Sequence, residues 1–279
     1  MKLIFLGTGS AFTLNNFQSN ILIEHNEKKL LLDAGSDIRF SLQNMNLTYR
    51  DIDAVYVSHL HADHAGGIEY LGFCSYFDPT KEKITLFGSG EVLRTGWDNS
   101  WKGGLESIQG KLLSLNDFFD TKPIKPNGSF TWQGINFKIV QSVHIMNGYS
   151  IVPCYGLMIE APAEVDGEDD SQEFKPKTIF WTADCQFCPS QIMDFYKEAD
   201  FIIQDCETTD FKSGVHANFI DLSTLPEQIR KKMFLTHYQD NVVVNFEQWQ
   251  QLAEKSNLKF AEKGQTIKFY DKSTYYSLT

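Results

Sequence analysis

The segment His59-Leu60-His61-Ala62-Asp63-His64 places three histidines and one aspartate within six residues, directly after an apolar run. Residues i and i+2 of a strand point to the same side, so His59 and His61 can face one metal ion where the strand ends. A turn after them lets Asp63 and His64 face a second ion. Imidazole and carboxylate groups suit borderline divalent ions such as zinc. The segment therefore predicts a site for divalent metal ions.

Four side chains cannot fill two metal sites, so further ligands must come from elsewhere in the chain. Three candidates each follow an apolar run of strand length: His144, Asp184 and His237. Taken singly, each position also fits a helix cap, a turn aspartate or a surface histidine. Their shared place, just past an apolar strand, favours a common site between two sheets.

The elements that must position these residues alternate between strands and helices. In the first half, strands are predicted at 3–6, 19–24, 29–33, 52–58 and 83–87, a helix at 37–45, and helices and loops from 65 to 110. In the second half, strands are predicted at 129–139, 156–160, 178–182, 201–204 and 232–236, and helices at 189–198, 225–231 and 246–255. No stretch in this pattern has the composition of a linker, so we expect one domain over residues 1–279.

The charge balance is acidic, with 25 Lys and Arg against 36 Asp and Glu and a formal net charge of −11. Only four of the cations are arginine, the residue best suited to bidentate phosphate contacts. Such a surface repels nucleic acid and anionic membranes. Six of the acidic residues lie in 161–177, which we expect to form an exposed acidic loop between two strands.

Two further features concern the environment of the protein. No apolar run approaches the roughly 20 residues that a membrane span needs, so we expect no contact with a membrane. Five cysteines are an odd number and sparse for 279 residues, which favours the reducing cytoplasm. Cys185 and Cys188 have the spacing of a redox or zinc pair, but no second pair exists and we interpret them as ordinary thiols.

The histidine segment, together with residues 3–10 and Leu31-Leu32-Asp33-Ala34-Gly35, resembles the metallo-β-lactamase fold superfamily over nearly the whole chain. The resemblance implies an αββα sandwich of two mixed sheets flanked by helices, with a two-metal site at one edge. It also implies a ligand assignment. The first ion would be held by His59, His61 and His144, the second by Asp63, His64 and His237, and Asp184 would bridge both.

A second segment, Gln204-Asp205-Cys206-Glu207-Thr208-Thr209, resembles a short motif of the ribonuclease Z branch, with Glu207 at the place of its glutamate. His216, which follows it, matches a further histidine of that branch. The resemblance implies dinuclear hydrolysis of a phosphodiester. Asp63 would orient the attacking water, and His216, steadied by Glu207, would protonate the leaving oxygen.

The metal-site motif does not identify the substrate, so this must be inferred from the missing arm and the net charge. Ribonuclease Z carries a protruding arm for transfer RNA, and the matching stretch 145–177 has room only for a strand and the acidic loop. With the net charge, this favours a small cyclic nucleotide, as in arm-less phage members of the branch, over transfer RNA 3′ processing. Members of the branch typically form homodimers. Phe73, Trp97 and Trp101 could stack on a base, although packing in the core explains each of them as well.

Other readings stay open at this point. The metal ions are expected to be zinc, with manganese or iron as alternatives, because availability decides among them as much as the ligands do. A thioester or lactone hydrolase would use the same two ions, without an evident need for Glu207 and His216. A non-catalytic metal-binding protein could retain the fold and lose ligands, yet every expected ligand is present.

Overall fold

The computed structural model describes residues 1–161 and 177–269, and two seven-stranded sheets dominate this part of the chain. The first sheet has the spatial order β16 (Thr266–Lys268), β1 (Lys2–Gly7), β2 (Asn20–His25), β3 (Lys28–Leu32), β4 (Ala54–Val57), β5 (Ile84–Ser89), β8 (Phe119–Ile124). The second has the order β15 (Lys259–Phe260), β14 (Met233–Thr236), β13 (Phe201–Asp205), β12 (Lys177–Trp181), β11 (Tyr155–Ala161), β10 (Ile135–Gln141), β9 (Ser129–Trp132). A short hairpin of β6 (Ser107–Ile108) and β7 (Lys111–Leu112) stands apart.

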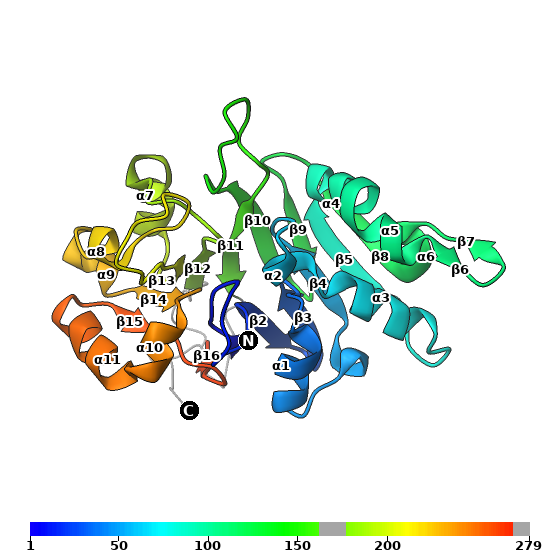
Figure 1. Cartoon of the computed structure of the whole chain (residues 1–279), viewed down its shortest axis with the longest axis horizontal. Helices are drawn as coiled ribbons and strands as arrows, with labels where there is room; N and C mark the ends of the chain where they lie inside the picture. Colours follow the sequence, from blue (N-terminus) through cyan, green and yellow to red (C-terminus); the bar gives the residue numbers. More distant parts are fainter. Residues whose placement is uncertain (162–176, 270–279) are drawn as a thin grey trace, which may run out of the picture.

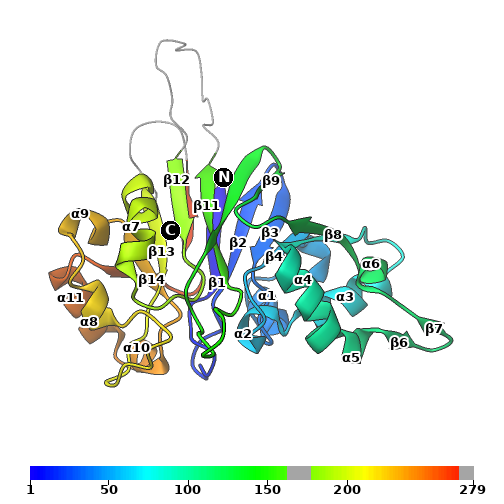
Figure 2. The same cartoon turned by 90° about the horizontal axis from the view of Figure 1, so that it is seen from above.

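Helices cover the outer faces of both sheets, so the layers run helix, sheet, sheet, helix (Figures 1 and 2). On the first sheet they are α1 (Ile38–Asn44), η1 (Tyr49–Asp51), α2 (Ala62–Ala65), α3 (Ile68–Tyr76), α4 (Gly90–Gly96), η2 (Trp97–Trp101), α5 (Lys102–Leu105) and α6 (Leu115–Phe118). On the second they are α7 (Pro189–Glu198), α8 (Phe219–Leu222), α9 (Glu227–Arg230), α10 (Asp240–Val244) and α11 (Phe246–Lys255). None of these helices is long and apolar enough to cross a membrane.

The carboxyl ends of the inner strands meet at one edge of the sandwich. β3, β4 and β5 are parallel to one another, as are β12, β13 and β14. β10 is antiparallel to β11, which is antiparallel to β12, so β10 also ends at that edge. Loops at the carboxyl ends of parallel strands are the usual place for a ligand in open α/β sheets.

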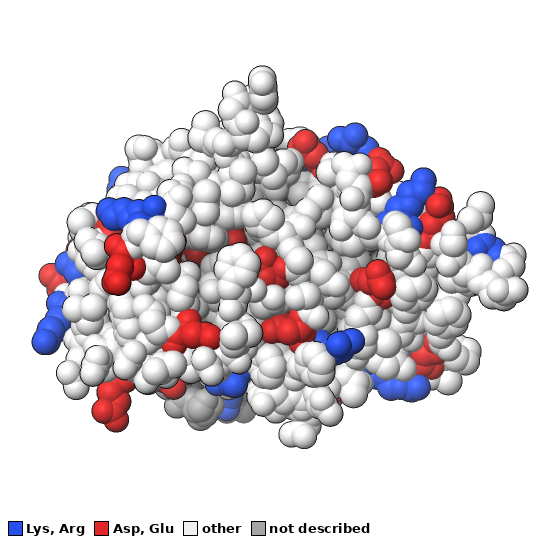
Figure 3. Space-filling model, viewed as in Figure 1, with Lys and Arg blue, Asp and Glu red and all other residues white. Residues whose placement is uncertain are grey.

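Acidic side chains lie near the middle of the face shown in Figure 3, whereas most lysines and arginines lie toward its edges. The helix α2, which follows β4, lies near the middle of the same view (Figure 1). The face above the strand ends is therefore not a basic surface. The acidic loop predicted at 161–177 lies outside the described residues, except for its two end residues in β11 and β12.

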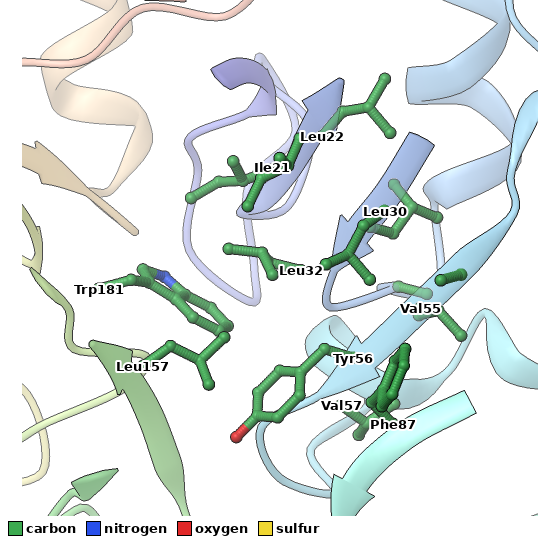
Figure 4. Close-up of a cluster of buried hydrophobic side chains, with 14 of the residues drawn as sticks. Ile21, Leu22, Leu30, Leu32, Val55, Tyr56, Val57, Phe87, Leu157 and Trp181 are labelled. Carbon is green, nitrogen blue, oxygen red and sulfur yellow. The ribbon is translucent and has the colours of Figure 1, made fainter. Parts of the chain in front are cut away.

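The core between the two sheets is built from the alternate apolar side chains of both (Figure 4). Tyr56 of β4 meets Trp181 of β12 edge to face, with ring centroids 6.1 Å apart. The Tyr56 hydroxyl donates a hydrogen bond of 3.0 Å to the carbonyl of Tyr155, which begins β11. An edge-to-face pair adds about 0.5–1.5 kcal/mol to the burial of the two rings. These contacts hold β4 and β12 at a fixed separation, and both strands lead into residues of the predicted metal site.

One predicted strand is wrong. The stretch 129–139 forms two strands, β9 and β10, joined by a tight turn. Gln133 and Gly134 occupy the turn with φ of 49° and 80°, the left-handed backbone typical of two-residue hairpins. The apolar residues on both sides of the turn made the stretch read as one continuous strand. The strands β6, β7, β8, β15 and β16 were not predicted.

Candidate metal centre

The structure brings the seven residues proposed as metal ligands together at the edge between the two sheets. The loop after β4 and helix α2 supply four of them, and the others lie within three residues of the ends of β10, β12 and β14. They form two groups that share Asp184. The nitrogen and oxygen atoms of each group lie within 4.8 Å of one another: His59, His61, His144 and Asp184 in the first group, and Asp63, His64, Asp184 and His237 in the second.

The first group has three imidazole rings that converge. His61 Nδ1 lies 3.1 Å from His59 Nε2 and 3.1 Å from His144 Nε2. Asp184 Oδ2 lies 3.7 Å from His59 Nε2 and 3.6 Å from His144 Nε2. His61 is the exposed member, whereas His59, His144 and Asp184 are at most 2% exposed. The group is therefore buried on one side and open to solvent at His61.

The second group is more deeply buried. His64 Nε2 lies 3.1 Å from Asp63 Oδ2 and 3.2 Å from Asp184 Oδ1. His237 Nε2 lies 3.1 Å from Asp63 Oδ2 and 3.5 Å from Asp184 Oδ2. All four residues are buried, with exposed fractions between 1% and 5%. Two carboxylates and two imidazoles at this spacing form a donor set that suits a divalent ion.

In three of the histidines, Nδ1 faces away from the site and lies next to an oxygen atom. These contacts fix the orientation of each ring and therefore of Nε2. His64 Nδ1 contacts Asp33 at 2.7 Å and His144 Nδ1 contacts the Val215 carbonyl at 2.8 Å. His59 Nδ1 lies 3.0 Å from Ser58 Oγ, which itself donates to Asp33. Each of these Nδ1 atoms donates to its oxygen partner, and this fixes the ring so that Nε2 faces the centre of the site.

One buried atom tests the fit of a cation directly. His64 Nε2 has no hydrogen-bond partner among the described residues, although it lies close to Asp63 and Asp184. An unpartnered buried polar atom is costly, and a cation between this nitrogen and the two carboxylates would satisfy all three groups. The residues present therefore fit a metal ion at this position.

The rings and carboxylates of the site shift one another's pKa, and the two ligand groups differ in this respect. Burial, reinforced by the neighbouring rings, lowers the pKa of His59 and His144, so both are neutral. Burial alone would raise the pKa of Asp63 and Asp184, but the nearby imidazoles His64 and His237 hold both below the ordinary value. Burial alone would lower the pKa of His64 and His237, but the carboxylates of Asp184 and Asp63 raise both. Metal ions bind neutral imidazoles and ionised carboxylates, so an ion in the second group would displace the protons of these two rings.

The loop 33–37 holds α2 in place beneath the site. The amide of Ala34 donates to the carbonyl of His64 at 2.8 Å, and the amide of Gly67 donates to that of Ala34 at 2.8 Å. A Cβ at Gly35 would lie 2.3 Å from the carbonyl oxygen of Asp63, which excludes any side chain there. Glycine at this position lets the loop approach closely enough to fix Asp63 and His64.

His216 lies beside the second group, but its partner differs from the residue that the sequence indicated. His216 Nδ1 lies 2.8 Å from Asp205 Oδ2, and Asp205 Oδ1 lies 3.4 Å from His237 Nδ1. Glu207 instead accepts hydrogen bonds from the Ser213 amide at 2.9 and 3.3 Å. The acid in contact with His216 is therefore Asp205, to which sequence reasoning had assigned no role.

The three aromatic side chains considered for base stacking all pack against the core, Trp101 buried and the other two partly buried. Trp101 is 4% exposed and donates from Nε1 to the Ala65 carbonyl at 3.2 Å. Phe73 packs against Phe118 and Phe77, with ring centroids 5.6 and 5.9 Å apart. Trp97 is partly buried against the core. Core packing accounts for all three.

Comparison with known proteins identifies the family. The family described as "Anti-Pycsar protein Apyc1" matches residues 1–267. The chain belongs to the Apyc1 family. One relative, an "Anti-Pycsar protein Apyc1" of Paenibacillus harenae, is 31% identical over 244 residues, or 87% of this chain and 91% of the relative.

Solved structures show the fold of this Apyc1-family chain. The metallo-β-lactamase fold protein YhfI from Bacillus subtilis is 20% identical with a TM-score of 0.69, over 95% of this chain and 97% of YhfI. Human tRNase Z, short form, is 18% identical with a TM-score of 0.64, over 96% of this chain and 99% of that chain. The αββα sandwich of the metallo-β-lactamase fold is thereby confirmed.

Adding zinc to the metal-free Apyc1-family chain is expected to raise its melting temperature. A ligand at 100 times its Kd that binds only the folded state stabilises it by about 2.7 kcal/mol. For a chain of this size each kcal/mol shifts Tm by roughly 2–4 °C, so we expect a rise of about 5–10 °C. Differential scanning fluorimetry measures it. Asp184→Asn, which alters the residue common to both groups, should abolish the shift, and an unchanged Tm in the parent protein would contradict the metal site.

Proposed function

We propose that the chain is a metal-dependent phosphodiesterase that hydrolyses a small cyclic nucleotide. The observation that carries this proposal is the arrangement of two ligand groups around Asp184, with the His216–Asp205 pair beside them. Metal ligands supply the place for the phosphate, and the histidine supplies a proton donor next to it. The name Anti-Pycsar protein Apyc1, which the relatives carry, supports a cyclic nucleotide as the substrate.

The residues of the two groups would hold two divalent ions, which we propose to be zinc, with manganese or iron as alternatives. His59, His61 and His144 would hold one ion, Asp63, His64 and His237 the other, and Asp184 would bind both. When bound, such a pair of ions supplies Lewis acidity toward the phosphate oxygens and the attacking water.

The chain's own side chains would then perform three tasks. Asp63, ionised and next to His237, would accept a hydrogen bond from the attacking water and orient it. His216 is the part-exposed member of its pair, and it would donate the Nε2 proton to the leaving oxygen. Asp205 would accept from His216 Nδ1 and keep the ring in the orientation that presents Nε2 to the substrate.

The preference for a small substrate rests on charge and on the loop after β10. The formal net charge is −11, and acidic groups lie near the middle of the face in Figure 3, so a polyanion such as transfer RNA would be repelled. After His144, the segment 145–154 forms only a short hairpin, closed by the bridge between Met146 and Ile151, before β11 begins. A homodimer and a cytoplasmic location stay predictions of the sequence.

The test compares the two classes of phosphodiester in one experiment. Zinc-loaded and chelated protein are incubated with 3′,5′-cyclic nucleotides and, in parallel, with a transfer RNA precursor, and products are resolved by chromatography and gel electrophoresis. We expect metal-dependent conversion of a cyclic nucleotide to the linear monophosphate, at a higher kcat/KM than RNA cleavage. Cleavage of the precursor alone would favour transfer RNA processing. No metal-dependent turnover of either phosphodiester would overturn the proposal, and a parallel assay with a thioester and a lactone would then test the other class of hydrolase.

A further inference from the structure

Two cysteines lie in contact immediately behind the candidate metal centre. Cys185 Sγ and Cys188 Sγ are 3.7 Å apart, and neither is part of a disulfide. Cys185 is fully buried, whereas Cys188 is partly exposed. A disulfide needs the two sulfurs at about 2.05 Å, so the bond requires a further approach of less than 2 Å. The pair is therefore close to the geometry of a disulfide and has one sulfur that a solute can reach.

The segment that carries the pair is fixed at both ends. Cys188 is the N-cap of the helix α7, and its carbonyl accepts a hydrogen bond from the Gln191 amide at 3.0 Å. The Gln186 amide donates to the Val143 carbonyl at 2.7 Å, and its side chain donates to the His144 carbonyl at 2.7 Å. The hydrogen bond from the Cys185 thiol also lowers the pKa of Cys188. These contacts keep the two sulfurs facing each other.

Cys185 also contacts the residues of the site directly. Its amide donates to Asp205 Oδ2 at 2.9 Å, and the same oxygen accepts from His216 Nδ1 at 2.8 Å. Cys185 directly follows Asp184, the residue common to both ligand groups. The Asp184 carbonyl in turn accepts a hydrogen bond from the buried thiol of Cys154 at 3.3 Å. A movement of Cys185 toward Cys188 therefore acts on Asp184 through the backbone and on Asp205 through the hydrogen bond.

We propose that Cys185 and Cys188 form a reversible disulfide whose formation weakens metal binding at the adjacent centre. The oxidant is a peroxide. The Cys188 thiolate attacks one peroxide oxygen, the O–O bond breaks, and Cys188 becomes a sulfenic acid while the other oxygen leaves and is protonated. The Cys185 sulfur then attacks Cys188 Sγ, the S–S bond forms, and the hydroxyl group leaves as water with the Cys185 proton. The two thiols lose two electrons, which reduce the peroxide to water.

The disulfide draws Cys185 away from its present position, and the ligand set changes with it. Metal affinity depends on the partners that orient the ligands, and the loss of one such partner typically costs 10–100-fold in affinity. We expect a loss within that range when the pair is oxidised. The coupling to metal binding rests on the metal site proposed above, whereas formation of the disulfide does not.

The first measurement maps the bond. The full-length protein is treated with hydrogen peroxide, alkylated and digested with trypsin, which cuts after Lys177 and Lys197. The peptide 178–197 contains both cysteines of the pair and no other cysteine. We expect the oxidised peptide to carry no alkyl group and to be two hydrogens lighter than the unmodified dithiol peptide, whereas the reduced control carries two alkyl groups. Dithiothreitol before alkylation should restore the doubly alkylated form. Absence of this product, with both thiols alkylated or over-oxidised, would overturn the inference.

The second measurement tests the coupling. Zinc affinity of the reduced and the oxidised protein is determined by competition with a chromogenic chelator. Cys188→Ser should keep the affinity of the reduced form under both conditions, and Cys74→Ser, a partly exposed thiol in α3, should behave as the parent. A disulfide with unchanged zinc affinity would overturn the coupling. A protein that binds no zinc in either state would contradict the metal site itself, which separates the two failures.

Discussion

Replacing His64 with alanine is expected to lower metal-dependent kcat/KM on bis(p-nitrophenyl) phosphate by more than about 100-fold, since the loss of a mere orienting partner already costs 10–100-fold in metal sites. His64 Nε2 lies within 3.2 Å of both Asp63 and Asp184 and lacks a hydrogen-bond partner among the described residues. Without this ring, the second group retains two carboxylates and His237 alone. The measurement is initial rate in zinc buffer, together with the zinc content of the purified protein.

Two further variants keep this prediction falsifiable. His64 also contacts the buried Asp33, so His64→Ala removes a structural partner as well as a proposed metal ligand. His61→Ala removes an exposed ring of the first group and disturbs the fold less, and it should also lose activity and zinc. His25→Ala, at the opposite end of β2 from the site, is the matched control and should keep both. Full activity and unchanged zinc content in His64→Ala would contradict the assignment.

The positions of the metal-site residues could be predicted from the sequence because each follows a continuous apolar run. Such a run is typical of a strand buried on both faces, and its end is where a polar side chain first becomes possible. His144, Asp184 and His237 were found in this way, and the structure places all three at the same edge. The hairpin of β9 and β10 was missed because Gln133 and Gly134 interrupt the apolar pattern by only two residues.

Asp205 was missed for a different physical reason. Asp205 and Glu207 are two residues apart, and on a continuing strand both would point to the same side. The chain turns after β13: the Cys206 amide still pairs with Thr236 in the next strand, whereas the Glu207 amide pairs with the Ala217 carbonyl. The turn directs Glu207 to Ser213 and leaves Asp205 on His216. The point at which a strand ends depends on its partners in the sheet, and local sequence does not contain that information.

His216→Ala is expected to lower activity on a substrate with a poor leaving group far more than on one with a good leaving group. A positioned proton donor contributes roughly 10²–10⁴-fold when the leaving group is a poor one, so we expect kcat on a cyclic nucleotide to fall by that factor. The p-nitrophenolate ion leaves without a proton, so kcat on bis(p-nitrophenyl) phosphate should change far less. Steady-state kinetics on both substrates with the same zinc-loaded preparation measures the contrast. An equal loss on both would mean that His216 acts through the metal site or the fold instead of as a proton donor.

The pH dependence of turnover identifies the acid that is the partner of His216. Burial alone would lower the pKa of His216, but the charge and the hydrogen bond of Asp205 raise it to about 9. The ring is protonated below that pKa, so turnover of the cyclic substrate should decrease as the pH rises through it. Asp205→Asn removes the charge and with it the largest contribution to the raised pKa, and should move this decrease to lower pH. Glu207→Gln, whose carboxamide can still accept from Ser213, removes only a smaller charge contribution and should move it less. The reverse outcome, a shift with Glu207→Gln alone, would assign the partner role to Glu207, because a charge that stabilises the imidazolium must act on its titration.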